Sequence, residues 1–482
     1  MLNVGLLSHS PHMCGGERML LHLAVGLSKT GRISPLLFIP SPGAGPLAAM
    51  AAEQGIRWAE VPPASWYFYE TPDTARSYWS RTALQTSGWC DVLRQYPLDV
   101  VLVNTLTSLP PALAAMKLQI PYVAWAHGIS DAGLLRRASP ISRVGENLTL
   151  QGAAHVVTCS EWTARHFRHR TAPQRVTPIV NWTEVPAGLP ASRRQPRRFA
   201  CLATLEKHKA LDVAIRAVGR LRGAGHKCSL DVYGDGADKE WFRQVIREEK
   251  LGNEVRLRGR TENVREVYET SLATVFPSRI EPFGMVAIES MARGTPVIAS
   301  AVGGLCEIID DGETGLLFES GNVQQLAACM ARLIEDPQEA DRLGQAGYRK
   351  ALAQFNGEVS LSKFEAIFRD AAESSAMDRD KFILTELLDA VAGVGQLDAP
   401  AFGPAQGNPL AGGGQFDVRS CYDRNAYGDY SVYDMAIAMA RAVRRRGVRR
   451  LAHNAFARGS EFVRGRFSKV LRRIRHPLSK RA

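Results

Sequence analysis

The sequence predicts an α/β protein with two doubly wound domains, each built on a parallel sheet that helices cover on both faces. Short apolar runs alternate with amphipathic helical patterns in two long blocks of the chain, and this alternation is typical of buried parallel strands. A basic, proline-containing stretch at residues 191–198 separates the blocks. We therefore interpret residues 186–198 as a linker between two domains.

The first domain is expected to span residues 1–185 and the second residues 199–354. In the first, a helix is expected at residues 16–29, with strands at residues 3–8, 36–39, 100–104, 121–126 and 155–159. In the second, strands are expected at residues 199–205, 229–233, 255–257, 273–276 and 296–299. Residues 355–373 are expected to form a closing helix that returns to the first domain, and residues 374–482 a C-terminal extension.

Composition and cysteine usage favour a globular protein of a reducing compartment. With 482 residues and 45% hydrophobic content, the chain is long enough for two or three domains with full cores. Its eight cysteines are scattered singly, without a C-x-x-C pair or a His cluster, so we expect reduced thiols and no structural zinc. No signal peptide is recognisable, and no uncharged apolar stretch approaches the roughly 18 residues of a spanning helix. We expect a cytoplasmic protein, soluble or bound to a membrane surface.

The net charge of +12 is concentrated at the end of the chain. Residues 441–482 contain fifteen Lys or Arg and one acid, Glu461, so the other 440 residues carry a net charge of −2. This nearly neutral body does not support a specific nucleic-acid site.

The basic tail has the pattern of a helix that lies on an anionic membrane surface. It follows a helix-like piece at residues 380–391 and a Gly/Pro-rich stretch at residues 400–414. Apolar residues recur at helical spacing at Val463, Phe467, Val470 and Ile474, and cations surround them. We expect the tail to hold the protein at the inner face of the cytoplasmic membrane. The alternatives are a basic helix that packs on the protein, or one that contacts nucleic acid nonspecifically.

The most specific motif is E-P-F-G-M-V-A-I-E-S-M-A-R-G-T-P-V-I-A at residues 281–299. Two carboxylates, Glu281 and Glu289, bracket a turn from strand to helix, and the helix is expected to begin near Met285. This turn places backbone N–H groups at a helix N-terminus, where they can receive an anion. The donors are those of Phe283, Gly284, Met285 and Val286.

Paired carboxylates beside an anion site suit a sugar nucleotide. A buried carboxylate accepts strong bidentate hydrogen bonds from vicinal hydroxyls, so a pair of such groups suits a ribose and a hexose that flank a diphosphate. The alternative is two solvated glutamates at an ordinary helix start.

The E-x7-E spacing of Glu281 and Glu289 resembles the retaining GT-B glycosyltransferases of the group 1, or family 4, type. The resemblance covers roughly residues 1–370. It implies two facing doubly wound domains with a cleft between them, and transfer of a hexose from a nucleotide-diphosphate sugar with retained anomeric configuration. It also implies that Glu281 contacts the donor sugar and that Glu289 contacts the ribose.

Further motifs are similar to those of the family and occur in the same order. Gly15 and Gly16, before the first long helix, match the glycine pair whose backbone approaches the donor phosphate. His127, in A-W-A-H-G, matches the active-site His near the transferred sugar, although a lone His at a strand end is more often structural. The resemblance therefore makes His127 and Glu281 the catalytic candidates. Asn181 and Trp182 match a signature at the domain junction, which we interpret as structural.

One position departs from the family pattern. The family commonly has an Arg and a Lys on the diphosphate, but here Thr204 stands where the Arg would be, and Lys209 keeps one cation. A Thr supplies no charge, so Lys207, His208 or a residue of the other domain would have to compensate. Arg260 is expected beside the nucleotide base.

The sequence thus predicts a retaining glycosyltransferase with a nucleotide-sugar donor and a glycan or lipid-linked acceptor, in cell-surface polysaccharide or glycolipid synthesis. No D-x-D motif stands out near the donor loops, so we expect no metal and no other cofactor. One alternative is an inverting GT-B enzyme or epimerase. The other is a non-catalytic protein that binds nucleotide sugars.

Overall fold

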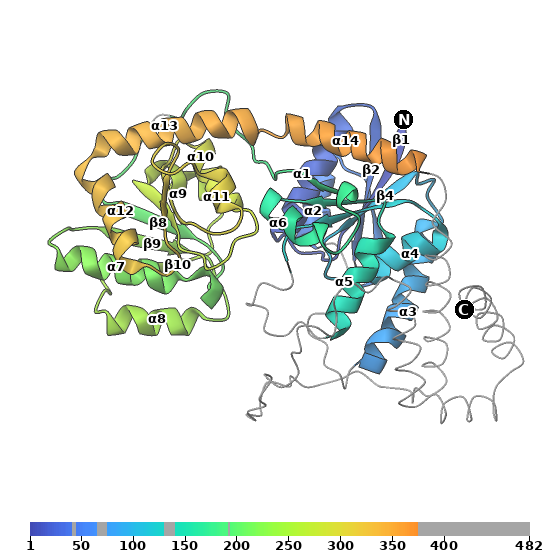
Figure 1. Cartoon of the computed structure of the whole chain (residues 1–482), viewed down its shortest axis with the longest axis horizontal. Helices are drawn as coiled ribbons and strands as arrows, with labels where there is room; N and C mark the ends of the chain where they lie inside the picture. Colours follow the sequence, from blue (N-terminus) through green and yellow to red (C-terminus); the bar gives the residue numbers. More distant parts are fainter. Residues whose placement is uncertain (41–44, 65–74, 130–139, 191–192, 375–482) are drawn as a thin grey trace, which may run out of the picture.

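The computed structural model describes residues 1–40, 45–64, 75–129, 140–190 and 193–374. These residues form two α/β domains, and two long helices, α13 (Pro337–Gln354) and α14 (Glu358–Glu373), run along one side of both (Figure 1). Each domain has one parallel sheet with buried side chains on both of its faces. The predicted fold class is therefore confirmed for this part of the chain.

The first domain has a seven-stranded parallel sheet in the order β3-β2-β1-β4-β5-β6-β7. In the central strand β4, Val101 and Val103 face one core, and Val100 and Leu102 face the other. Because both faces are covered, the strand is apolar at nearly every position. The strands are β1 (Leu2–Leu7), β2 (Ile33–Pro40), β3 (Trp58–Val61), β4 (Val100–Asn104), β5 (Tyr122–Ala126), β6 (His155–Thr158) and β7 (Val176–Pro178).

Helices cover both faces of this sheet. The first, α1, buries the apolar stripe that includes Met19, Leu23 and Leu27 against β2 and β4, and Glu17 and Lys29 complement its dipole at the two ends. The helices of this domain are α1 (Gly15–Lys29), α2 (Pro46–Glu53), α3 (Ala75–Leu93), α4 (Pro110–Leu118), α5 (Pro140–Gly152), α6 (Glu161–Arg168) and the short 3-10 helix η3 (Pro173–Arg175).

The second domain has a six-stranded parallel sheet in the order β10-β9-β8-β11-β12-β13. The strands are β8 (Arg198–Leu202), β9 (Ser229–Tyr233), β10 (Val255–Gly259), β11 (Ala273–Phe276), β12 (Val297–Ser300) and β13 (Leu316–Phe318). The helices are η4 (Lys207–Lys209), α7 (Leu211–Gly223), α8 (Lys239–Glu248), α9 (Val264–Thr270), α10 (Met285–Ala292), α11 (Leu305–Ile308), α12 (Val323–Glu335) and α13.

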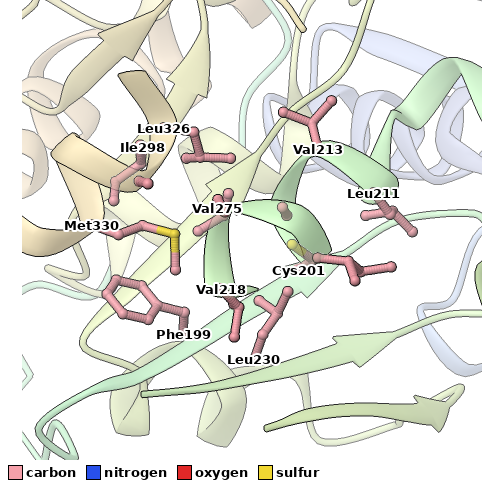
Figure 2. Close-up of a cluster of buried hydrophobic side chains, with 14 of the residues drawn as sticks. Phe199, Cys201, Leu211, Val213, Val218, Leu230, Val275, Ile298, Leu326 and Met330 are labelled. Carbon is pink, nitrogen blue, oxygen red and sulfur yellow. The ribbon is translucent and has the colours of Figure 1, made fainter. Parts of the chain in front are cut away.

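The core of this domain lies between its sheet and the helices α7 and α12. Figure 2 shows Phe199, Leu230 and Val275 of the strands facing Val218 of α7 and Met330 of α12. All of these side chains are at most 1% exposed, so the second domain has a complete hydrophobic core of its own.

The strand orders fix where ligands can bind. In each sheet the chain first builds strands to one side and then returns to the middle to build the other side, so the order reverses between β1 and β4 and between β8 and β11. Loops after these strands separate at the reversal and leave a crevice at the carboxyl ends of the strands. The residues that follow β1, β4, β8 and β11 are therefore the ones positioned to contact a ligand.

The chain crosses between the domains twice, and the two crossings lie side by side. The Thr183 N–H donates to the Phe355 carbonyl at 3.0 Å, and the Ser360 hydroxyl donates to the Val180 carbonyl at 2.9 Å. Gly357 adopts a φ of +91° between α13 and α14, and a Cβ there would lie 2.5 Å from Cδ1 of Trp182. Only glycine fits this crossing.

Helix α14 docks on the first domain, where it contacts α1, β4 and β5. The Phe364 ring lies 4.8 Å from the Trp125 ring and 6.1 Å from that of Trp182, between ring centroids. On the rim, Arg32 donates to both oxygens of Glu365 at 2.6 and 2.8 Å. An aromatic cluster with a bidentate ion pair thus attaches the last described helix to the domain where the chain begins.

Arginines of the predicted linker bind to the second domain. Arg194 pairs with Asp341 and donates to the Gly294 carbonyl at 2.8 Å, and Arg193 pairs with Glu269 at 2.7 Å. The expected extension at residues 374–482, with its helix, Gly/Pro-rich stretch and basic tail, lies outside the described residues except for Ser374. None of the helices in the described ranges is long and apolar enough to cross a bilayer.

Replacing Phe364 by Ala tests the docking of α14. We expect the free energy of unfolding of the first domain to fall by about 3–5 kcal/mol, because a buried ring is lost from a packed cluster. Urea unfolding followed by tryptophan fluorescence measures the change. Val359→Ala, at an exposed position of the same helix, is the control and should change stability by less than about 0.5 kcal/mol. Equal effects of the two substitutions would contradict the docking.

Candidate functional site

The candidate residues of both domains meet where the two strand reversals face each other. Arg18 in the second turn of α1 reaches Glu289 of α10, with 3.2 Å between Nη1 and Oε1. A Cβ placed on Gly128, just after β5, would lie 3.7 Å from Cγ of Pro282 in the loop after β11. The two domains therefore approach each other at the carboxyl ends of their central strands.

The loop of residues 281–284, called the donor loop below, leads from β11 into α10. Gly284 precedes the helix with a φ of +121°, and a Cβ there would lie 2.7 Å from Leu305. Among the residues that the structure describes, no side chain caps this helix N-terminus. Phe283 is buried and packs at the edge of the Phe355 ring, so it anchors the loop. The first backbone N–H groups of α10, at Met285 and Val286, thus lie at the open, electropositive end of the helix.

Glu281 pairs with Lys209 across the reversal of the second sheet. Lys209 Nζ lies 2.8 Å from Glu281 Oε2, and Ser278 Oγ lies 3.4 Å from the same oxygen. Both charged side chains are mostly buried, at 22% and 15% exposed. The structure therefore brings together Glu281, expected at the donor sugar, and Lys209, expected at the diphosphate. The two side chains form an ion pair with each other.

Glu289 has a partner for each carboxylate oxygen. Arg18 reaches Oε1, and the Tyr268 hydroxyl donates to Oε2 at 2.7 Å. Burial, and then the neighbouring Glu289 carboxylate, raise the pKa of Tyr268 well above its usual value, so Tyr268 keeps its proton and donates it. The pair orients Glu289 toward the cleft between the domains.

His127 lies directly after β5, beside the start of α1. Its Nε2 is 2.8 Å from Asn104 Oδ1, which accepts, so the proton of the neutral ring lies on Nε2. Burial, and to a smaller extent nearby His9, lower the pKa of His127 to about 3. A Cβ on Gly16 would lie 3.4 Å from the imidazole Cδ2, which explains why a small residue begins the helix there.

The N-terminus of α1 lies beside His127. Cys14 precedes the helix and makes no side-chain cap, and a Cβ on Gly15 would meet no atom of the described residues within 4 Å. Below it, the fully buried Glu17 lies 2.6 Å from His9 Nδ1. The first N–H groups of this helix thus form a second electropositive end in the site.

Thr204 and Arg260 lie at the rim of the site. Thr204 is exposed in the loop after β8, which ends at Leu202 rather than at Leu205. Burial and Glu17 raise the pKa of the Cys14 thiol, whereas Arg260 and Arg18 act in the opposite direction, so both guanidinium groups lie near this thiol. Thr204 supplies no positive charge to the site. Arg18 is therefore a cation of the first domain that lies close to it.

Sequence reasoning missed Arg18, Tyr268 and Asn104 as site residues. Arg18 lies two residues after the glycine pair, and its position near the start of a helix that begins at an anion site was the available signal. Tyr268 and Asn104 contact Glu289 and His127 from other elements, and no local pattern predicts such contacts.

Comparisons with known proteins identify the family of this chain. The model of the family "Glycosyl transferases group 1" matches residues 190–350, and that of "Glycosyl transferase 4-like domain" matches residues 15–182. The chain belongs to the group 1 glycosyltransferases. It is thus an enzyme of glycosyl transfer, and the two matches correspond to the second and the first domain.

Individual relatives of this glycosyltransferase cover most of the described residues. A glycogen synthase of Mycobacterium tuberculosis is 25% identical over 310 residues, which are 61% of this chain and 74% of the relative. A D-inositol 3-phosphate glycosyltransferase of Stackebrandtia nassauensis is 27% identical over 61% of this chain and 71% of the relative.

Solved structures share the GT-B fold of this glycosyltransferase. Anabaena HepE in complex with UDP-glucose is 19% identical, with a TM-score of 0.64, over 77% of this chain and 100% of that one. Sucrose-phosphate synthase from Thermosynechococcus elongatus is 20% identical, with a TM-score of 0.62, over 78% and 100%. At these identities the likeness establishes the fold.

The low pKa of His127 makes stability depend on pH. As the pH falls below 6.5, the unfolded chain takes up a proton at this residue. The folded protein does so only near pH 3, because its His127 has a pKa of about 3. Its contribution to stability is present above pH 6.5 and is lost toward pH 3, by up to about 1.4 kcal/mol per pH unit. Urea unfolding at several pH values between 7 and 4 measures this effect. The free energy of unfolding should fall less steeply with falling pH in His127→Gln than in the wild-type chain. Identical slopes would mean that His127 is not buried in neutral form.

Proposed function

We propose that this chain is a retaining hexosyltransferase that uses a nucleotide-diphosphate sugar as donor and a glycan or lipid-linked molecule as acceptor. The observation that carries the proposal is the arrangement of Glu281 and Glu289 around the uncapped N-terminus of α10, with Lys209 beside them. Carboxylates match sugar hydroxyls, whereas a helix N-terminus and an ammonium group match a diphosphate. The solved structure of HepE with UDP-glucose supports a donor of this class.

Each candidate group has a task in this reaction. Lys209, the α10 N-terminus and the backbone of Gly15 and Gly16 would stabilise the negative charge that builds on the diphosphate. Glu281 and neutral His127 would bind the sugar hydroxyls and orient the anomeric carbon. Glu289, held by Tyr268, would bind the ribose, and Arg260 would lie near the base.

In the proposed reaction the bond between the anomeric carbon and the diphosphate oxygen breaks, and a bond to the acceptor oxygen forms on the same face of the sugar. The acceptor hydroxyl gives its proton to the leaving phosphate oxygen, so no separate base is needed. The products are a nucleoside diphosphate and a glycoside. We expect transfer without added metal, because protein cations and helix N-termini are already placed to meet the diphosphate charge.

A panel of UDP- and GDP-sugars, with and without EDTA, tests the proposal by nucleotide release and by the anomeric configuration of the product. Glu289→Ala should weaken binding of the free nucleotide by about 1.5–3 kcal/mol, because the ribose loses a charged partner. Calorimetry with the free nucleotide measures this loss.

Glu281→Ala, in the loop before α10, is the matched comparison for Glu289→Ala, which lies within that helix. It should leave nucleotide affinity nearly unchanged and lower turnover, since its partner is the transferred sugar. Product of inverted configuration would favour the inverting alternative. Nucleotide-sugar binding without any release would favour a non-catalytic binding protein.

We further propose that residues 441–482 bind an anionic membrane surface and hold the enzyme near a lipid-linked acceptor at the inner face of the cytoplasmic membrane. The support is the pattern of the sequence, in which Val463, Phe467, Val470 and Ile474 form an apolar stripe between cations. Such a location suits an enzyme of cell-surface polysaccharide or glycolipid synthesis.

Deleting residues 441–482 should release the protein from anionic liposomes, because each cation near the surface adds roughly 1 kcal/mol to binding. Cosedimentation measures the bound fraction, and neutral liposomes are the control. Transfer to a soluble acceptor analogue should remain. Equal sedimentation of the full and the truncated chain would contradict the membrane role.

A further inference from the structure

The junction of β6 and α6 in the first domain is bonded directly to the donor loop of the second domain. Ser160 Oγ donates to the Pro282 carbonyl at 2.7 Å, and Thr163 Oγ1 lies 3.4 Å from the same oxygen. Both residues are fully buried. The donor loop thus meets its partner in the other domain at the residue next to Glu281.

A second contact joins the same helix to the second domain. The Glu307 carboxylate accepts the N–H groups of Glu161 at 2.9 Å and of Trp162 at 2.5 Å, so it caps the N-terminus of α6 from across the domain boundary. A carboxylate at a helix N-terminus is favoured by the helix dipole. Two independent sets of hydrogen bonds therefore fix α6 relative to the donor loop.

The same junction also reaches the His127 segment. The buried Cys159 thiol lies 3.6 Å from the His127 carbonyl and 3.8 Å from the Pro282 carbonyl, so residue 159 touches the segments that carry both sugar-site candidates. On its other side the donor loop is fixed within its own domain, since the Gly304 N–H donates to the Glu281 carbonyl at 2.9 Å. A Cβ on Gly303 would lie 2.1 Å from that carbonyl oxygen, so the close approach requires glycine.

We propose that Ser160 and Thr163 are positioning residues that hold the donor loop against the first domain and thereby set the separation of His127 and Glu281. The catalytic meaning of that separation rests on the proposed function. We call residues 159–163 together with Glu307 and Pro282 the clasp. The clasp is a contact between the domains, and it can be measured without any substrate. Because the reacting sugar lies between the two candidates, a loosened clasp lowers turnover while the nucleotide, bound through Glu289 elsewhere on α10, keeps its affinity.

Three substitutions of Ser160 separate its two roles. Ser160 also caps α6, since its Oγ accepts the Thr163 N–H at 3.1 Å. Ser160→Asp keeps a capping oxygen but cannot donate to the Pro282 carbonyl, Ser160→Ala loses both functions, and Ser160→Thr keeps both. Asn322→Ala, which removes the cap of α12 away from the clasp, is the matched control for loss of a helix cap.

The readouts are the alkylation rate of Cys159 in the full chain, followed by peptide mass spectrometry, and the kinetics of nucleotide release. Burial raises the pKa of the Cys159 thiol to about 12, so the thiol should react slowly while the clasp is closed. Ser160→Asp and Ser160→Ala should raise the alkylation rate by about fivefold, the change expected from one lost hydrogen bond. They should lower kcat by at least that factor with unchanged nucleotide affinity, whereas Ser160→Thr and Asn322→Ala should match the wild-type chain.

Two results would overturn the proposal. Unchanged alkylation of Cys159 in Ser160→Asp would mean that the hydrogen bond to Pro282 does not hold the domains together. Faster alkylation with unchanged kcat would mean that the clasp exists but positions nothing for catalysis. If the wild-type chain releases no nucleotide from any donor, the proposed function fails, and the alkylation rates still decide whether the clasp exists.

Discussion

Parallel strands all end at the same edge of a sheet, and this constraint decides where the candidate residues of the glycosyltransferase lie. In both sheets the strand order reverses next to the strand that begins the domain, at β1 and at β8. The carboxyl ends of the strands at these reversals, and the segments that follow them, carry the glycine pair and Asn104 in one domain and Lys209 and Glu281 in the other. The contacts across the cleft follow from placing these two edges opposite each other.

The site balances its charges before any ligand is bound. Lys209 is paired with Glu281, and Arg18 is paired with Glu289. A sugar nucleotide carries its own acceptors and donors in the matching order, with hydroxyls for the carboxylates and phosphate oxygens for the cations. In the proposed complex, binding would exchange ion pairs of the protein for charge-assisted hydrogen bonds to the ligand, without leaving a partly buried charge unpaired. The half-exposed Arg18 is the side chain of the four that can move at least cost.

Sequence patterns predicted the central parts of the fold better than its margins. Strands such as β4, β9 and β11 were located to the residue because they lie inside their sheets and most of their residues are apolar and buried. The edge strands β3 and β7 and the short β13 were missed, and in β3 the exposed Glu60 interrupts the apolar run. The pattern around residues 281–289 identified a strand, a turn and a helix correctly, since turn chemistry is local. The ion pairs of Glu281 and Glu289 depend on residues 72 and 271 positions away, and only the fold brings those together.

The two chain crossings have a consequence for how the domains can move. Because Thr183 is bonded to Phe355 and Ser360 to Val180, both connections pass through one narrow bundle of backbone beside Trp182. Two covalent connections at one place act as a hinge between the domains. They resist sliding and twisting of one domain against the other and leave mainly a single rotation. A rotation of one domain about this point would separate the backbone segments that bring Arg18 to Glu289 and Ser160 to Pro282 in the same movement.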